Sequence, residues 1–313
     1  MNERLLSSAR ILIFEITLGE IQKLLAAANI PILVLKGPHV AGTLYDDPAE
    51  RIYCDLDVLV RPEHYYPAAR ILLPNGFKLF SVNKRRLASE KADYQLLLRA
   101  PRGVVIELHC ALADRDQFYS DVNGFFQRSE EFILGDLRLQ GLGKEDNLVH
   151  LCLHLGKRHF SHGEKKHLLD IALLLKKKKV DWPIFLDRVK RAGCRMITYY
   201  CLEAVRIRQG TEVPREIMAS LSPSPWRRRI LGRYLDPNVF PIYRFHETVP
   251  GFRERMVNLL LLDRIPTMVF STLRFAGRSL LNLLLRAAPL RRMWLKRYPL
   301  RQWMDERYKL SKK

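Results

Sequence analysis

The chain has 313 residues, 48% of them hydrophobic, so it can bury a sizeable core and its composition excludes disorder throughout. About two domains are expected at roughly 150 residues each. The formal charge of +20 predicts attraction to an anion, which charge alone leaves as a nucleotide, a nucleic acid or an acidic membrane surface. No apolar run reaches the roughly 18 to 20 residues of a membrane span, because Asp263, Arg264 and Arg274 interrupt the best candidate.

Cysteine usage and the N-terminus indicate a reducing location. The five cysteines are odd in number and widely scattered, which fits no disulfide framework and no CxxC zinc pattern. Glu15 and Glu20 stand where a secretory signal would need an uncharged core and a cleavage site. We therefore expect a cytoplasmic protein, with a peripheral place at the inner membrane surface as the alternative. The cysteines are Cys54, Cys110, Cys152, Cys194 and Cys201.

The first half of the chain mixes helical and strand patterns. Apolar side chains at mixed spacings of three and four predict an amphipathic helix over residues 4–28. A buried strand over 32–35 runs into a glycine turn and a helix that extends through Tyr45, and residues 52–60 alternate as a second strand. A further helix is predicted over residues 63–73. Strand character follows over residues 77–80, 94–99 and 104–109, with a turn at 101–103.

From Glu145 onward the pattern is helical. An α+β head followed by an α-helical half is therefore the expected fold class. The 222–225 segment (SPSP) is the best linker candidate, and we predict domains at 1–143, 144–222 and 223–313. The helices are predicted over residues 147–159, 166–177, 182–192, 196–209, 253–262 and 267–286.

The C-terminal region is the basic part of the chain. Residues 224–313 hold 20 Lys and Arg against 6 Asp and Glu, and the last segment interleaves Trp294, Tyr298 and Trp303 with basic residues. Three interpretations fit: contact with RNA or DNA, an interfacial membrane helix, or a helical cap with a solvated basic face. We rank the cap first because the Leu-rich faces need burial, and polyanion contact stays an alternative.

Two carboxylates on one predicted strand suggest a metal site. Over residues 52–60 the period of two places Asp55 and Asp57 on one face, with Leu56 and Val58 on the other. Without a cation the two charges would repel, and one carboxylate would take up a proton. Mg²⁺ binds one or two carboxylates together with substrate phosphates, which makes it the expected ion.

Glu107 offers a third carboxylate on the predicted strand over residues 104–109. If that strand neighbours the first, the three acids can hold two ions, one activating an attacking hydroxyl and the other stabilising a leaving pyrophosphate. We therefore predict Asp55, Asp57 and Glu107 as catalytic residues and metal ligands. Taken singly each acid also fits a solvated strand face, and their order along the chain favours the site.

Other residues near these acids are candidates for binding a phosphorylated cofactor. The turn at Lys36 and Gly37 offers free backbone N–H groups and the positive end of a helix, to which Lys36 adds a charge, although it also fits a plain strand-to-helix connection. Arg51 either neutralises phosphate or pairs with an acid, and we favour phosphate. His109 shares the face of Glu107 and either contacts substrate, orients a carboxylate or is a half-buried structural histidine.

A group of histidines in the helical half invites a zinc interpretation. His150 and His154 are four residues apart on a predicted helix, but the spacing matches no standard ligand set. We interpret His154 as a polar core or site-lining residue, and Asp170 as a cap or partner of one of the histidines. The neighbouring members of this group are Cys152, His159, His162 and His167.

Several local sequences together resemble one bacterial family. They are LKG at 35–37, LY at 44–45, Arg51 followed by DLDVLV at 55–60, ELH at 107–109, and LVHLCLHLGKRHF at 148–160 followed by LLDIALLL at 168–175. Over roughly residues 10–210 the chain is similar to the "uncharacterised nucleotidyltransferase" family of the polymerase-β-like superfamily.

The resemblance implies a minimal palm-like mixed sheet with flanking helices, an NTP donor and Mg²⁺. It implies metal binding by Asp55, Asp57 and Glu107 and a phosphate turn at Gly37. Pro38 departs from the superfamily pattern, where Gly or Ser follows the glycine, and removes one backbone donor. Pro38 therefore counts against triphosphate binding by that turn, whereas the three acids keep the metal-binding pattern of the family.

The expected activity is transfer of an NMP from an NTP to an unknown acceptor, with release of pyrophosphate. The acceptor classes left open are a small molecule, a sugar, a protein side chain and tRNA. The alternative is a non-catalytic module of the same fold that binds nucleic acid or anionic membrane through its basic C-terminal region. Three converging carboxylates argue against that alternative, because a surface that only binds polyanions gains nothing from them.

Overall fold

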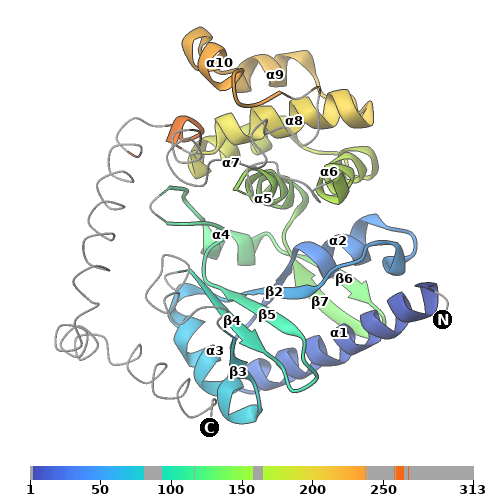
Figure 1. The fold of residues 1–313 in the computed structure, drawn as a ribbon. Coiled ribbons are helices and arrows are strands. Elements are labelled where there is room, and N and C mark those ends of the chain that lie inside the picture. The colour runs from blue at the N-terminus through green and yellow to red at the C-terminus, as the bar shows by residue number, and fades with distance from the viewer. Residues whose placement is uncertain are drawn as a thin grey trace.

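A computed structural model describes most of the first three quarters of the chain (Figure 1). The predicted helix over 267–286 lies outside the described residues, apart from residue 267. The final aromatic and basic segment, His159 and His162 also lie outside them. The described residues are 3–80, 94–115, 117–157, 165–236, 238, 257, 259–263 and 267, with side chains described from residue 10 on and not at 157.

The described part of the first half is built on a mixed seven-stranded sheet, which confirms the α+β class. Strands β2 and β5 are parallel neighbours, which meets the condition set for the predicted site, and their register sets Asp57 opposite Glu107. The order across the sheet is β3-β4-β5-β2-β1-β7-β6. The strands are β1 (Leu33–Leu35), β2 (Asp55–Leu59), β3 (Lys78–Leu79), β4 (Gln95–Arg99), β5 (Val105–His109), β6 (Glu130–Leu134) and β7 (Leu137–Gly141).

The two faces of this sheet differ in chemistry. Leu56 and Val58 of β2 are fully buried in one apolar cluster with residues of α1 and α3. Because side chains alternate along a strand, Asp55 and Asp57 face the other way, toward the helical half. The helices of this half are α1 (Glu3–Ala26), α2 (Lys36–Leu44), α3 (Tyr65–Leu72) and α4 (Val122–Gln127), with 3₁₀ turns η1 (Pro48–Glu50), η2 (Pro62–His64) and η3 (Leu73–Asn75).

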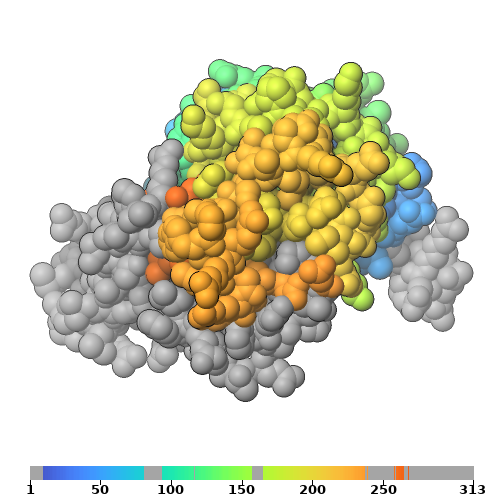
Figure 2. Space-filling view, turned by 90° about the horizontal axis from the view of Figure 1, so that it is seen from above, coloured from blue at the N-terminus to red at the C-terminus, as the bar shows by residue number. Residues whose placement is uncertain are grey.

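The second half is helical, as predicted, and packs over the acidic face of the sheet (Figure 1). Seen from above, the yellow and orange atoms of α8, α9 and α10 lie in front of most of the first half (Figure 2). Leu231 at the end of α10 belongs to the same buried cluster as Phe185 and Tyr200. The helices are α5 (Lys144–Lys157), α6 (Lys165–Lys177), α7 (Trp182–Ala192), α8 (Arg195–Gln209), α9 (Arg215–Leu221) and α10 (Pro225–Leu231).

Helix α7 has the predicted bounds because both of its ends carry local stop signals. The Asp181 carboxylate accepts a hydrogen bond from the Ile184 backbone N–H at 3.0 Å, which caps the first turn. Gly193 ends the helix in the left-handed region, at a φ of 70°, where glycine is unstrained.

Five of the elements were not predicted from the sequence because their signals are short. Helix α4, the hairpin of β6 and β7, and helices α9 and α10 have five to seven residues each, too few for a clear period. The 222–225 segment joins α9 to α10, and the predicted domain boundaries stay predictions. Among the described residues no helix combines the length and apolar character required to cross a membrane.

Candidate active site

The strand-to-helix turn at the start of α2 sets one wall of the site. Lys36 lies directly after β1 in the left-handed region, at a φ of 48°, which is uncommon for a residue with a side chain. A Cβ atom at Gly37 would lie 2.6 Å from the Cβ atom of Tyr53, so only glycine allows this close approach. The local sequence thereby fixes the direction in which the Lys36 side chain leaves the turn.

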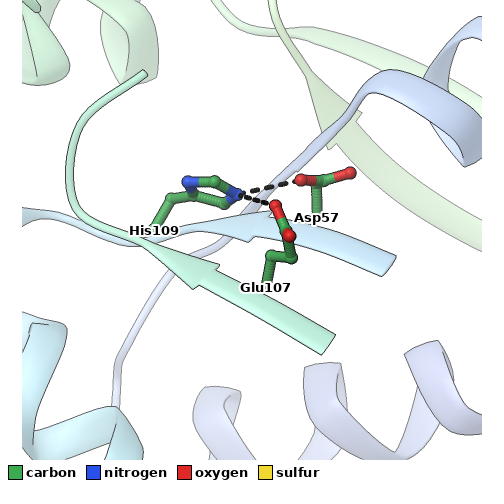
Figure 3. Close-up of side chains that lie close together, drawn as sticks. All are labelled: Asp57, Glu107 and His109. Atoms are coloured by element: carbon green, nitrogen blue, oxygen red, sulfur yellow. Dashed lines mark hydrogen bonds and ion pairs between the residues drawn. The ribbon is translucent and has the colours of Figure 1, made fainter. Parts of the chain in front are cut away.

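Asp57, Glu107 and His109 converge on one point of the sheet (Figure 3). The parallel pairing of β2 and β5 brings the two acids side by side, and His109 follows Glu107 by two residues on the same face. His109 Nε2 lies 2.9 Å from Asp57 Oδ1 and 3.4 Å from Glu107 Oε2. Asp57 is 1% exposed, so its charge is almost completely removed from water.

Lys36 supplies positive charge to the same pair of acids. Its ammonium donates a hydrogen bond to Asp57 Oδ1 and lies 3.5 Å from Glu107 Oε2. Burial alone would lower the pKa of Lys36, but the charges of Asp57 and Glu107 outweigh burial and raise that pKa above its ordinary value. The lysine is therefore held in its charged form.

The pKa values of Asp55 and Glu107 are shifted in opposite directions. Burial and the neighbouring charge of Asp57 raise the pKa of Asp55 to about 6. Burial would also raise the pKa of Glu107, but the hydrogen bond with His109 and the charge of Lys36 hold that pKa below its ordinary range. Burial would lower the pKa of His109, and its hydrogen bonds with Asp57 and Glu107 raise it instead.

The donor set fits a divalent cation. Asp57, Glu107 and His109 each offer one ligand atom, and these atoms all lie within 4.8 Å of one another. Asp55 adds negative charge from the same strand face, and the charges of Asp57 and Glu107 raise its pKa. Three acids and Lys36 leave two uncompensated negative charges, which equals the charge of one divalent ion.

Arg51 has a different environment from the one expected. Its guanidinium holds Asp170 of α6 with two hydrogen bonds of 2.7 Å each, and both side chains are buried. The Tyr45 hydroxyl donates to the same carboxylate at 2.8 Å, and His167 Nδ1 lies 3.4 Å from Asp170 Oδ2. The structure thus gives Arg51 the acid partner that we had placed second to phosphate, and gives Asp170 the histidine partner expected for it.

The histidines of the helical half take structural positions. The rings of His154 and His167 pack edge to face at 4.8 Å between centroids, and His150 is 1% exposed. Within the described residues, the group that could hold a metal contains none of the three. Sequence reasoning did not find Tyr45 as a partner of Asp170 or His167 as a neighbour of Arg51. The available signal was the i, i+3 spacing of His167 and Asp170 on α6.

Lys36→Met is expected to lower the free energy of unfolding by about 3 kcal/mol at neutral pH without added metal. The substitution leaves two largely buried carboxylates, Asp57 and Glu107, without their cation. The pKa of Glu107 is lower in the folded protein than in the unfolded chain. The resulting stabilisation is complete above the unfolded pKa of about 4.3 and is lost progressively as the pH falls from there toward the folded pKa. The loss in the variant should therefore shrink at acid pH, which urea unfolding at pH 7 and pH 4 measures.

Lys177→Met is the matched control for that measurement, because Lys177 pairs with the exposed Asp46 at the surface. We expect it to unfold like the wild type at both pH values. An equal loss for Lys36→Met at pH 7 and pH 4 would contradict the assigned role of Lys36, since packing loss does not depend on the ionisation of Glu107.

The fold has paired acids on adjacent strands beside a strand-turn-helix, which is the arrangement expected from the family resemblance. The family model described as "uncharacterised nucleotidyltransferase" matches residues 2–208, and the chain belongs to that family. This confirms the resemblance seen in the local sequences and places the chain among the transferases. The comparison with curated proteins gave no match.

The chain has low similarity to several solved structures of nucleotidyltransferases. The antibiotic-resistance factor ANT(2'')-Ia is 12% identical, with a TM-score of 0.42 over 59% of this chain and 91% of its own. The lincosamide antibiotic adenylyltransferase LnuA is 16% identical, with a TM-score of 0.33 over 51% and 95%. An antigenic nucleotidyltransferase-like protein from Paracoccidioides brasiliensis is 18% identical, with a TM-score of 0.39 over 66% and 90%. The assignment to the family rests on the family model.

Proposed function

We propose that the protein transfers an NMP from an NTP to an acceptor and releases pyrophosphate, with Asp55, Asp57 and Glu107 holding one or two Mg²⁺ ions. The observation that carries this proposal is the parallel pairing of β2 and β5, which sets Asp57 directly opposite Glu107. A buried Asp57 beside a partly buried Glu107 is costly without a cation, and the family is described as nucleotidyltransferases.

In the proposed reaction an acceptor oxygen forms a bond to the α-phosphorus while the bond from that phosphorus to the bridging oxygen breaks. Pyrophosphate leaves with the electrons of the broken bond, and the acceptor proton passes to a carboxylate or to solvent. A bound divalent ion supplies charge neutralisation for the leaving group and activation of the acceptor oxygen. The chain supplies the carboxylates that hold the ion, and Glu107, with 19% of its side chain exposed, is open to the acceptor.

We propose Lys36, Gly37 and His109 as contacts of the NTP and its cation. Lys36 places a largely buried positive charge beside the carboxylate of Asp57. The backbone at Gly37 lies in the first turn of helix α2, where N–H groups are free to bind an anion. Pro38 removes one of the first N–H donors of that helix, so the lysine has the larger part. We leave Arg51 out of this proposed group because its guanidinium is paired with Asp170.

The remaining assignments stay proposals. The acceptor is a small molecule, a sugar, a protein side chain or tRNA, and the location is cytoplasmic or peripheral at the inner membrane surface. The basic region 223–313, which is largely outside the described residues, is proposed as a helical cap, with polyanion contact as its alternative role.

The test is a thermal-shift titration with ATP, GTP, CTP and UTP, with and without Mg²⁺. A ligand that binds only the folded state stabilises it by roughly 2.7 kcal/mol at a hundredfold excess over its dissociation constant, so a donor registers without its acceptor. We expect a Mg²⁺-dependent shift with at least one nucleotide in the wild type. The shift should be lost in the Asp55→Asn/Asp57→Asn variant.

The matched control is Asp46→Asn/Asp136→Asn, which removes the same charge from exposed positions. It should keep the full nucleotide shift. No shift with any nucleotide in the wild type would overturn the proposal and favour the non-catalytic module, which RNA and anionic-vesicle binding would then test.

A further inference from the structure

His109 has the position of a metal ligand rather than of a bystander to the acids. It is 3% exposed, and its Nε2 atom points at the carboxylates of Asp57 and Glu107 from distances of 2.9 Å and 3.4 Å (Figure 3). Its other ring nitrogen, Nδ1, has no hydrogen-bond partner among the described residues. Among the described residues, the polar contacts of the His109 ring are therefore made by Nε2, the atom that faces Asp57 and Glu107.

A second observation shows independently that a cation is favoured at this point. The Lys36 ammonium already contacts Asp57 and lies near Glu107, so positive charge is stabilised where the two carboxylates and the imidazole meet. Asp55 adds a further negative charge, so the site has more negative than positive charge even with Lys36 present. The ligand atoms of Asp57, Glu107 and His109 can therefore still accept a divalent ion.

An imidazole among the ligands changes which divalent ion the site prefers. Mg²⁺ takes oxygen ligands in near-ideal octahedral geometry, whereas first-row transition ions bind nitrogen together with carboxylate oxygen. We propose that His109 Nε2, Asp57 and Glu107 together bind a divalent transition ion in preference to Mg²⁺, and Mn²⁺ serves as the paramagnetic probe for this class of ion. This inference rests on the proposed function, which needs a cation at these acids. It adds a ligand and replaces Mg²⁺ by a transition ion as the preferred cation.

The first test measures binding of Mn²⁺ and Mg²⁺ to the nucleotide-free protein. The electron paramagnetic resonance signal of free Mn²⁺ gives its affinity directly, and competition gives that of Mg²⁺. We expect the wild type to bind Mn²⁺ at least about tenfold more tightly than Mg²⁺. His109→Gln should weaken Mn²⁺ binding at least about tenfold and Mg²⁺ binding much less, because the glutamine amide can still donate a hydrogen bond to the carboxylates but offers no imidazole nitrogen.

His64→Gln, in η2 beyond the end of β2, is the matched control and should leave both affinities unchanged. A second measurement avoids any folding defect of the variants: pulsed resonance on Mn²⁺ bound to the wild type should show magnetic coupling to a ring ¹⁴N nucleus.

The outcomes separate the inference from the proposed function. Absence of ¹⁴N coupling, or equal losses of Mn²⁺ and Mg²⁺ affinity in His109→Gln, would overturn the role of His109 while leaving a metal-dependent transferase intact. Failure of the wild type to bind either ion, with or without ATP, would remove the cation from the proposed function as well.

Discussion

Asp57→Asn is expected to reduce kcat/KM for nucleotidyl transfer by roughly 1,000-fold or more. Asp57 is the most buried acid of the site and contacts both Lys36 and His109. Loss of one charged ligand from a catalytic ion removes several kcal/mol of transition-state stabilisation, and about 4 kcal/mol corresponds to about 1,000-fold in rate. Pyrophosphate release from the NTP that the thermal-shift titration selects measures the effect, with candidate acceptors added in turn.

Two controls make that result specific to the site. Glu131→Gln removes an exposed carboxylate that pairs with the exposed Arg138 on the β6–β7 hairpin, and it should keep wild-type activity. Circular dichroism of Asp57→Asn should match the wild type, because the amide keeps the shape of the side chain. Activity within tenfold of the wild type in a folded Asp57→Asn variant would remove Asp57 from the catalytic group.

The acids of the site were predictable because their signal is local. The period of two puts Asp55 and Asp57 on one strand face, and Glu107 on the matching face of another strand, from the sequence alone. Their pairing also requires β2 and β5 to be neighbours in parallel register, which depends on tertiary structure and was only an assumption until the sheet order was known.

The partners of Arg51 and Lys36 were less accessible to sequence reasoning. Arg51 and Asp170 are 119 residues apart and meet only because α6 packs beside the segment before β2. Lys36 points into the acids because of the left-handed backbone at a non-glycine residue, which the sequence does not signal. The sequence placed Lys36 at the turn between a strand and a helix, which agrees with the structure. Its contacts with Asp57 and Glu107 follow from backbone geometry.

Arg51→Met is expected to lower the free energy of unfolding by about 3 to 5 kcal/mol at neutral pH. Removing one partner of a buried ion pair leaves the other charge uncompensated, and Asp170 is 0% exposed. Burial would raise the pKa of Asp170, but hydrogen bonds from His167 and Arg51 hold it below its ordinary value. That contribution is present above an unfolded pKa of about 3.9 and is lost as the pH falls below it, so the difference from the wild type should narrow at pH 3.

A double-variant cycle with Asp170→Asn tests whether the cost comes from an unpaired charge. Asp170→Asn alone leaves Arg51 unpaired and should cost about 3 kcal/mol, whereas Arg51→Met/Asp170→Asn should be less destabilised than the sum of the two single variants. Urea unfolding of the four proteins gives the coupling free energy. Additive losses would mean that Arg51 and Asp170 stabilise the protein separately. A large coupling would instead assign them one role, which is to hold α6 of the helical half against the segment that leads into strand β2.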